Sequence, residues 1–223
     1  MQSNNVEHIV YHGTERTRGE KFIDRQAMEP SIGNRHWLGD GSYFYKDLFY
    51  SYKWINDMYI SRNKKRHKDY EELISQYKIL CCIININKDR IFDLDENLEH
   101  KLLFDEFKAK VNEHSKYKSA LGNENIWDGI VLNIMFNEYG YTKKYDLIVA
   151  SFVRREIKNN KSRLNHVLEK QICVKNLEVI SKIRNKEFKE EYTKLEELMD
   201  MMKRREPEKY SKKRNRYSKE YLF

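Results

Sequence analysis

The sequence predicts one α+β domain that ends in a short basic segment. Three observations predict this fold class. Apolar runs rich in β-branched residues recur along the chain, which is typical of strands, and stretches with apolar residues at helical spacing lie between them. Hydrophobic residues make up 39% of the 223 residues and aromatic residues 13%, which argues against disorder even though 35% of the residues are charged. Because the chain has only 8 Gly and 2 Pro, collagen-like and low-complexity classes are excluded.

The elements in the N-terminal half follow from residue type and spacing. Aromatic and β-branched residues favour strands, a helical period of apolar residues favours helices, and Gly, Pro and Asn mark loops. Gly39 and Gly41 stand directly before an aromatic strand, so we expect a loop joined to a strand there. In chain order we expect a strand at 7–12 that runs into a turn, a helix at 18–28, a loop at 30–34, a strand within 36–45, helices at 47–62 and 70–77, and a buried strand at 80–86.

The C-terminal half continues with the same two kinds of element. We expect an extended segment at 90–94, helices at 98–111 and 127–139, and strands at 145–153 and 171–174. The last helix has the clearest pattern, because its apolar residues form one stripe with Glu and Lys on the other face. This stripe contains Phe188, Tyr192, Leu195, Leu198, Met199 and Met202. The main domain is therefore expected to span residues 1–184, followed by an amphipathic helix and basic tail at 185–223.

The three cysteines, Cys81, Cys82 and Cys173, are expected to be small core residues. Their spacing fits no metal site and their number fits no disulfide framework. No apolar run approaches the roughly 20 residues that a membrane span requires, and residues 1–10 lack the basic-then-apolar order of a signal peptide. We therefore expect a cytoplasmic protein that does not bind a membrane.

Positive charge is concentrated near the C-terminal end. The whole chain has a formal net charge of +8, and residues 203–219 contain nine basic and two acidic residues, a net charge of +7. Tyrosines interleave with these bases, which suits contact with phosphates and stacking on nucleobases. A solvated tail without a partner is the alternative, because charge runs alone are weak evidence. The candidate nucleic-acid-binding residues are Arg204, Arg205, Lys212, Lys213, Arg214 and Arg216.

Three short motifs carry the chemistry of the chain. They are YHGT at 11–14, after a strand, LGDGSYF at 38–44, at the start of a second strand, and QICVKN at 171–176, in a late strand. In this order and at this spacing they resemble the His-Tyr-Glu class of ADP-ribosyltransferases, which includes poly(ADP-ribose) polymerases, diphtheria-toxin-like enzymes and small bacterial toxins. The likeness is densest between residues 11 and 54. It implies a split β-sheet with peripheral helices and a cleft that holds NAD.

The resemblance implies a role for each residue of the first two motifs. His12 would hydrogen-bond a ribose hydroxyl of the adenosine half, and Gly13 would let the main chain approach the nicotinamide carboxamide. Tyr43 and Trp54 would contact the nicotinamide ring, and Ser51 would bond its carboxamide. Taken singly, each ring is better explained as a structural or core residue, whereas their combination favours an NAD site. The expected NAD-binding residues are His12, Gly13, Thr14, Tyr43, Ser51 and Trp54.

The third motif departs from the class, because Gln171 stands where a catalytic Glu usually opens the late strand. That Glu hydrogen-bonds the nicotinamide-ribose 2′-hydroxyl and stabilises an oxocarbenium-like transition state. A Gln keeps the hydrogen bond but has no charge and accepts no proton, so we expect transfer of a single unit rather than chain elongation. Glu169 shares the strand face of Gln171 and is the second candidate for the carboxylate. For Glu169, an exposed charge in the run Glu169-Lys170 is the slightly favoured interpretation. The expected catalytic residues are His12, Tyr43, Gln171 and Glu169.

The sequence thus predicts an NAD-dependent mono-ADP-ribosyltransferase that consumes NAD as a substrate, releases nicotinamide and needs no metal. The basic segment and a pI near 9.1 favour a nucleic-acid acceptor, RNA in particular or single-stranded DNA. Arg16, Arg18, Arg35 or Lys53 would meet the NAD phosphates, although solubility explains these residues equally well. Small bacterial enzymes that resemble this chain often act as toxins in toxin–antitoxin or anti-phage systems, which implies an antitoxin protein as partner. The alternatives are a protein acceptor, or an idle NAD- or nucleic-acid-binding module, which the Gln at position 171 suggests.

Overall fold

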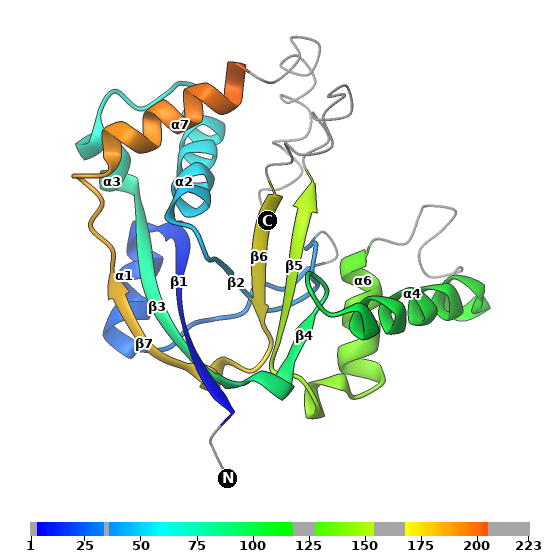
Figure 1. The fold of residues 1–223 in the computed structure, drawn as a ribbon. Coiled ribbons are helices and arrows are strands. Elements are labelled where there is room, and N and C mark those ends of the chain that lie inside the picture. The colour runs from blue at the N-terminus through cyan, green and yellow to red at the C-terminus, as the bar shows by residue number, and fades with distance from the viewer. Residues whose placement is uncertain (1–3, 34–35, 118–127, 154–167, 205–223) are drawn as a thin grey trace.

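A single mixed β-sheet is the framework of the computed structural model, which describes residues 4–33, 36–117, 128–153 and 168–204. The seven strands of these residues lie in the order β4-β5-β6-β2-β1-β3-β7 (Figure 1). β4 and β5 are parallel, and the other neighbouring strands are antiparallel. The strands are β1 (Asn5–Glu15), β2 (Ser42–Tyr45), β3 (Tyr77–Asn87), β4 (Ile91–Asp93), β5 (Leu147–Val153), β6 (Leu168–Val174) and β7 (Ile180–Asn185).

The sheet divides between β1 and β2. These two strands share one Cα pair, Tyr11 with Tyr45, whereas β1 pairs with β3 along its whole length of 11 residues. The half formed by β1, β3 and β7 therefore diverges from the half formed by β4, β5, β6 and β2 (Figure 1). Apolar side chains from both halves, such as Val10 and Ile172, meet in one buried cluster. The sheet is thus split into two halves that share a core.

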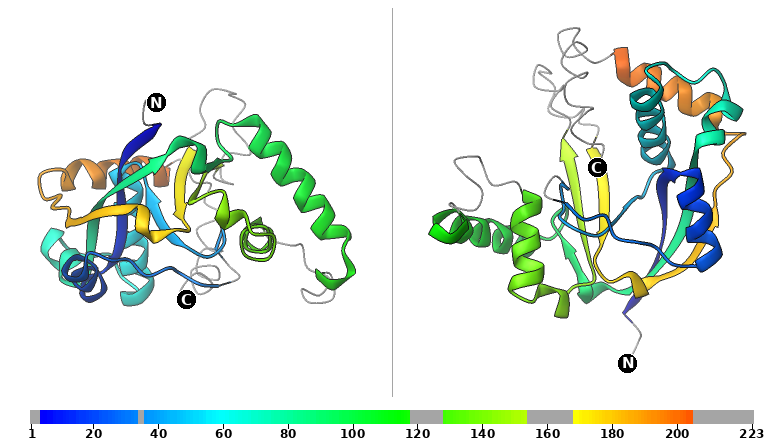
Figure 2. Two further views of the ribbon diagram at one scale, coloured as in Figure 1. Left: turned by 90° about the horizontal axis from the view of Figure 1, so that it is seen from below. Right: turned by 180° about the vertical axis from the view of Figure 1, so that it is seen from behind.

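Helices cover the two halves separately. α2, α3 and α7 gather near β1 and β3, whereas α4 and α6 lie beside β4 and β5 (Figures 1 and 2). Asp47, Asp69 and Asn97 accept hydrogen bonds from main-chain N–H groups at the starts of α2, α3 and α4, so the sequence itself fixes these helix ends. The helices are α1 (Arg16–Arg25), α2 (Leu48–Asn63), α3 (Tyr70–Gln76), α4 (Leu98–Glu113), α6 (Asp128–Asn133), which continues as a π-helical turn at Ile134–Glu138, and α7 (Tyr192–Arg204).

The α+β class and most of the expected elements are confirmed. β7 was not expected; it is an edge strand in which only Ile183 is buried, so it lacks the apolar run that marks β3. Phe188 was expected within the last helix, but it precedes α7, which begins at Tyr192. Its side chain is nevertheless buried in the same cluster as those of Leu195 and Met199. An apolar stripe therefore identified the shared core correctly and the start of the helix incorrectly.

The cysteines behave as small core residues, as expected. Cys82 and Cys173 are buried, Cys81 is partly buried, and all three thiols are free. Among the helices of the described ranges, none combines the length and apolar character that crossing a membrane requires.

Candidate active site

His12 lies on β1 where β1 and β2 separate. The preceding residue, Tyr11, forms the single Cα pair with β2, and the Nδ1 atom of His12 lies 2.7 Å from the carbonyl oxygen of Tyr43 on β2. Because a carbonyl oxygen only accepts hydrogen bonds, Nδ1 carries the proton. In the neutral ring Nε2 is then an acceptor. The imidazole thus bridges the two strands and keeps a lone pair for a hydroxyl donor.

The surroundings of His12 keep its imidazole neutral. Burial lowers the pKa of His12 to about 4; the hydrogen bond to the Tyr43 carbonyl acts in the opposite direction, and the charge of Arg18 lowers the pKa further. The rings of Phe44 and Phe22 lie 5.7 and 6.3 Å from the imidazole, centroid to centroid. A neutral, hydrogen-bonded imidazole suits recognition of a sugar hydroxyl better than that of an anion.

Gly13 brings β1 into direct contact with α2. A Cβ atom at Gly13 would lie 2.9 Å from the carbonyl oxygen of Ser51 and 3.0 Å from Cε3 of Trp54, closer than such atoms pack. The side chain of Ser51 is fully buried, and its hydroxyl has no hydrogen-bond partner within the described ranges. A buried hydroxyl without a partner is unfavourable by about 1–3 kcal/mol. Gly13, Ser51 and Trp54 therefore lie together, as the resemblance implies, around an unsatisfied polar atom.

Thr14 belongs to a different contact. It is buried, and a Cβ atom at Gly19 of α1 would lie 2.9 Å from its Cγ2 atom. Because side chains alternate along a strand, Thr14 lies on the face of His12 rather than on that of Gly13. Thr14 thus packs against α1, away from Ser51 and Trp54.

Tyr43 holds the loop that precedes β2. Its hydroxyl donates to the carbonyl of Gly39 at 2.6 Å and accepts from the N–H of Leu38 at 2.9 Å. Its ring lies 5.6 Å from that of His36. Burial raises the pKa of the Tyr43 phenol above its ordinary value, so the phenol stays protonated. Because the hydroxyl already takes part in two hydrogen bonds, the part of Tyr43 that can contact a ligand is its ring.

Glu169 and Gln171 form a buried polar pair on β6. The Nε2 atom of Gln171 donates to Oε1 of Glu169 at 2.8 Å, and the two residues are 7% and 9% exposed. The favoured expectation that Glu169 is an exposed charge is therefore wrong. β6 lies inside the sheet, between β5 and β2, so both of its edges are paired. Its neighbour Lys170 faces the opposite side, where it pairs with Asp95 at 2.6 Å.

The strand register places the polar pair on the same face as the tyrosines of β2. Tyr45 pairs with Gln171, and Tyr43 pairs with Cys173. Burial, and then the neighbouring Glu169, raise the pKa of Tyr45 well above its ordinary value. Sequence analysis did not single out Tyr45, although its spacing of two residues from Tyr43 is the signal for a shared face.

The rings of His12, Tyr43 and Trp54 border the split of the sheet from different sides. His12 lies on the same face of the sheet as Phe44. Tyr43 packs with the apolar cluster that contains residues of α4 and α6. Trp54 packs with the apolar cluster that contains residues of α2 and α7. The expected residues are thus neighbours around β2 but do not share one layer. Of the expected nucleic-acid-binding residues, Arg204 ends α7; its side chain and the residues from 205 onward lie outside the described residues.

A cavity of about 460 Å³ lies beside α1, and His12 is not one of its lining residues. One of its lining residues is Phe22, whose ring neighbours that of His12, and another is Arg18, whose charge affects the pKa of His12. Most of the other lining side chains are charged. The cavity is lined by Glu15, Thr17, Arg18, Lys21, Phe22, Arg25 and Glu29.

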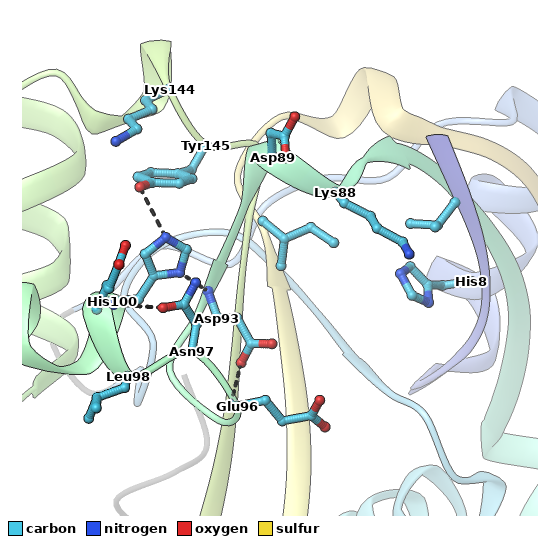
Figure 3. A pocket seen from close by; sticks show the side chains of 13 residues that line it. His8, Lys88, Asp89, Asp93, Glu96, Asn97, Leu98, His100, Lys144 and Tyr145 are labelled. Carbon is cyan, nitrogen blue, oxygen red and sulfur yellow. Dashed lines mark hydrogen bonds between the residues drawn. The ribbon is translucent and has the colours of Figure 1, made fainter. Parts of the chain in front are cut away.

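A larger cavity of about 920 Å³ lies at the other end of β1 (Figure 3). On one of its sides Nδ1 of His100 accepts from the main-chain N–H of Asp93 at 3.0 Å, so Nε2–H faces the Tyr145 hydroxyl at 3.2 Å. His8 and Lys88 lie on the opposite side. Neither of these two cavities is lined by Gly13, Tyr43, Ser51 or Trp54.

The chain is similar to one curated archaeal protein. It is 36% identical over 194 residues to "Uncharacterized protein MJ0359" of Methanocaldococcus jannaschii, and the match covers 80% of this chain and 86% of that protein. No family model matches the chain, and no solved structure matches it.

Proposed function

The chain belongs to the same family as the archaeal protein MJ0359, whose name states no activity, and from the residues of this chain we propose that the chain is an NAD-dependent mono-ADP-ribosyltransferase. The observation that carries this proposal is the buried hydroxyl of Ser51, which lies beside Gly13 and Trp54 and has no hydrogen-bond partner among the described residues. An orphaned polar atom next to a glycine main chain and an indole is a site for a flat ligand with an amide group.

The nicotinamide ring of NAD has the groups that this site requires. Its carboxamide offers N–H donors and a carbonyl acceptor, which match the Ser51 hydroxyl and the main chain of Gly13. Trp54 on α2 and Tyr43 on β2 are the aromatic residues that we expect to contact the ring. Entry of the ring requires α2 and β1 to separate slightly, because the Trp54 side chain contacts Gly13 in the closed conformation.

The adenosine half of NAD fits the other face of the split. His12 supplies a neutral acceptor at Nε2 for a ribose hydroxyl. The cavity of about 460 Å³ would contribute Arg18, Lys21 and Arg25 as counter-charges for the phosphates. The dinucleotide would therefore cross the sheet where β1 and β2 separate.

Glu169 supplies the carboxylate that the third motif lacks at position 171. In the reaction the bond between the ribose C1′ atom and the nicotinamide nitrogen breaks, and nicotinamide leaves with the electron pair. A buried carboxylate stabilises the positive charge that develops on the sugar, and it takes the proton from the acceptor nucleophile as the new bond to C1′ forms. Gln171 orients this carboxylate through its hydrogen bond at 2.8 Å. We expect one ADP-ribose unit per acceptor site.

The acceptor proposed here is nucleic acid, with RNA favoured. The net charge of +8 and the basic segment near the C-terminus support a polyanionic partner. The test is incubation with NAD labelled in the adenylate half, in the presence of total RNA. We expect release of nicotinamide and a labelled product that RNase destroys. A labelled product that resists RNase and is destroyed by protease would identify protein as the acceptor.

The matched variants are Glu169→Gln and Glu178→Gln. Glu178 is an exposed glutamate after the same strand, so its change controls for the loss of a charge. Nicotinamide release is expected to fall by about two orders of magnitude or more in Glu169→Gln and to stay unchanged in Glu178→Gln. Binding of NAD without any nicotinamide release by the unmodified protein would instead identify an idle binding module.

A further inference from the structure

Trp37 is a large aromatic residue that remains exposed next to the candidate carboxylate. Its side chain is 39% exposed, and its ring centroid lies 4.6 Å from that of Phe152 on β5. Phe152 is paired with Glu169 across β5 and β6, so the two side chains lie on the same face as direct neighbours. A molecule that approaches Glu169 from the solvent side of this pair therefore meets the indole of Trp37.

The loop that carries Trp37 is held firmly. The Tyr43 hydroxyl bonds both Leu38 and Gly39. The N–H of Asp40 donates to Oδ1 of Asn133 at 2.6 Å, and Nζ of Lys175 donates to the carbonyl of Leu38 at 2.7 Å. Four hydrogen bonds from three directions thus fix the residues that follow Trp37. An exposed ring on a fixed loop loses little conformational entropy when a ligand stacks on it.

We propose that Trp37, supported by Phe152, is the stacking surface for an unpaired nucleobase of the acceptor strand. The proposal rests on the proposed function, which it deepens by assigning the acceptor site. A nucleobase presents the flat π-face that an exposed indole binds, whatever the base, and the basic segment at residues 203–219, which carries +7 of the net charge of +8, favours a polyanionic strand over a peptide. The ring lies on the side of Glu169 away from β2, so it leaves Tyr43, Ser51 and Trp54 to NAD.

This placement gives the acceptor nucleotide its chemical role. With one base on Trp37, a hydroxyl or ring nitrogen of that nucleotide or its neighbour lies near Glu169. That atom forms the bond to C1′ of the ADP-ribose unit as the bond to nicotinamide breaks, nicotinamide keeps the electron pair, and the proton of the nucleophile passes to the Glu169 carboxylate. Stacking at Trp37 therefore selects single-stranded acceptors, because bases within a duplex have no free face.

The test compares Trp37→Ala with Trp37→Phe, and uses Leu102→Ala as a control. Leu102 is 59% exposed on α4, so its change also removes exposed apolar surface. Binding of a fluorescein-labelled single-stranded oligoadenylate is measured without NAD, alongside an abasic strand of equal length. We expect Trp37→Ala to weaken oligoadenylate binding about tenfold or more, Trp37→Phe to restore most of it, and abasic-strand binding to be insensitive to all three changes.

Nicotinamide release in the absence of RNA supplies the second measurement. We expect all three variants to match the unmodified protein in this reaction, since none of the altered residues contacts NAD. Equal oligoadenylate binding by Trp37→Ala and the unmodified protein would overturn the inference, as would a rise in the KM for NAD, or competition by a peptide but not by RNA. No nicotinamide release from the unmodified protein would refute the proposed function, while the binding measurement would still report on Trp37.

Discussion

At the scale of single residues, His12 joins two strands through its ring. Its pKa is lowered from 6.5 to about 4 by burial. Between these two pH values the unfolded chain binds more protons than the folded protein, so the free energy of unfolding falls as the pH falls through this window. The contribution amounts to at most about 3 kcal/mol. We expect His12→Gln to be less sensitive to pH over this range than the unmodified protein.

Urea unfolding at a series of pH values measures this difference. The other histidines with lowered pKa values remain in both proteins, so the difference between the two curves isolates His12. Two parallel curves between pH 6.5 and 4 would mean that the ring has no such shift.

Two buried serines form a matched pair that tests the orphaned hydroxyl. Ser42 is 2% exposed and donates to the carbonyl of Glu29 at 3.1 Å, whereas Ser51 is 0% exposed and has no partner within the described ranges. We expect Ser42→Ala to lower the free energy of unfolding by about 1 kcal/mol and Ser51→Ala to leave it unchanged or slightly raised. We also expect Ser51→Ala to raise the KM for NAD. An equal loss of stability in both variants would show that Ser51 has a protein partner.

At the scale of elements, the contact between β1 and α2 depends on Gly13. We expect Gly13→Ala to lower the free energy of unfolding by about 1–3 kcal/mol, because its Cβ would meet both Ile55 and the Ser51 carbonyl. Ile55→Ala removes the Cγ2 atom that the new Cβ would meet, so the loss in the double variant should be smaller than the sum of the losses in the two single variants. Denaturant unfolding of the single and double variants checks this. Full stability of Gly13→Ala would contradict a close approach of β1 to α2.

Docking of α7 is the second test at this scale. Leu195 is 5% exposed in the cluster shared with α2, whereas Met201 is 53% exposed on the same helix. We expect Leu195→Ala to lower the free energy of unfolding by about 2–5 kcal/mol and Met201→Ala to change it by no more than about 0.5 kcal/mol. Urea unfolding followed by circular dichroism measures both. Similar effects of the two changes would mean that α7 does not pack through this face.

The elements were largely predictable because their signals are local. Apolar periodicity gave α2 and β3, and Asp47 and Asp69 mark helix starts within one turn of the chain. β7 has no comparable signal, because only one of the residues of this edge strand is buried. The burial of Phe188 depends on helices that are distant in the sequence. The pairing of β2 with β6 likewise joins segments from opposite ends of the chain, so no local pattern reveals it.

At the scale of the whole molecule, the candidate site draws on several elements, and this limits what the sequence could predict. The resemblance placed Gly13, Ser51 and Trp54 together, and the packing of β1 on α2 agrees. Glu169 is buried although its neighbour in the sequence is the charged Lys170, so the run of two charges conceals this burial. The role proposed for Trp37 depends on its contact with Phe152 of β5, and the three motifs do not include Trp37.

A crystal structure of the protein with NAD would show whether NAD binds across the split between β1 and β2. We expect the nicotinamide carboxamide within hydrogen-bond distance of the Ser51 hydroxyl and the main chain of Gly13, with Glu169 facing the ribose. We also expect a ribose hydroxyl at Nε2 of His12, in agreement with this binding mode. Density for NAD in the cavity lined by His8 and His100, with the contact between Gly13 and Trp54 still closed, would contradict it.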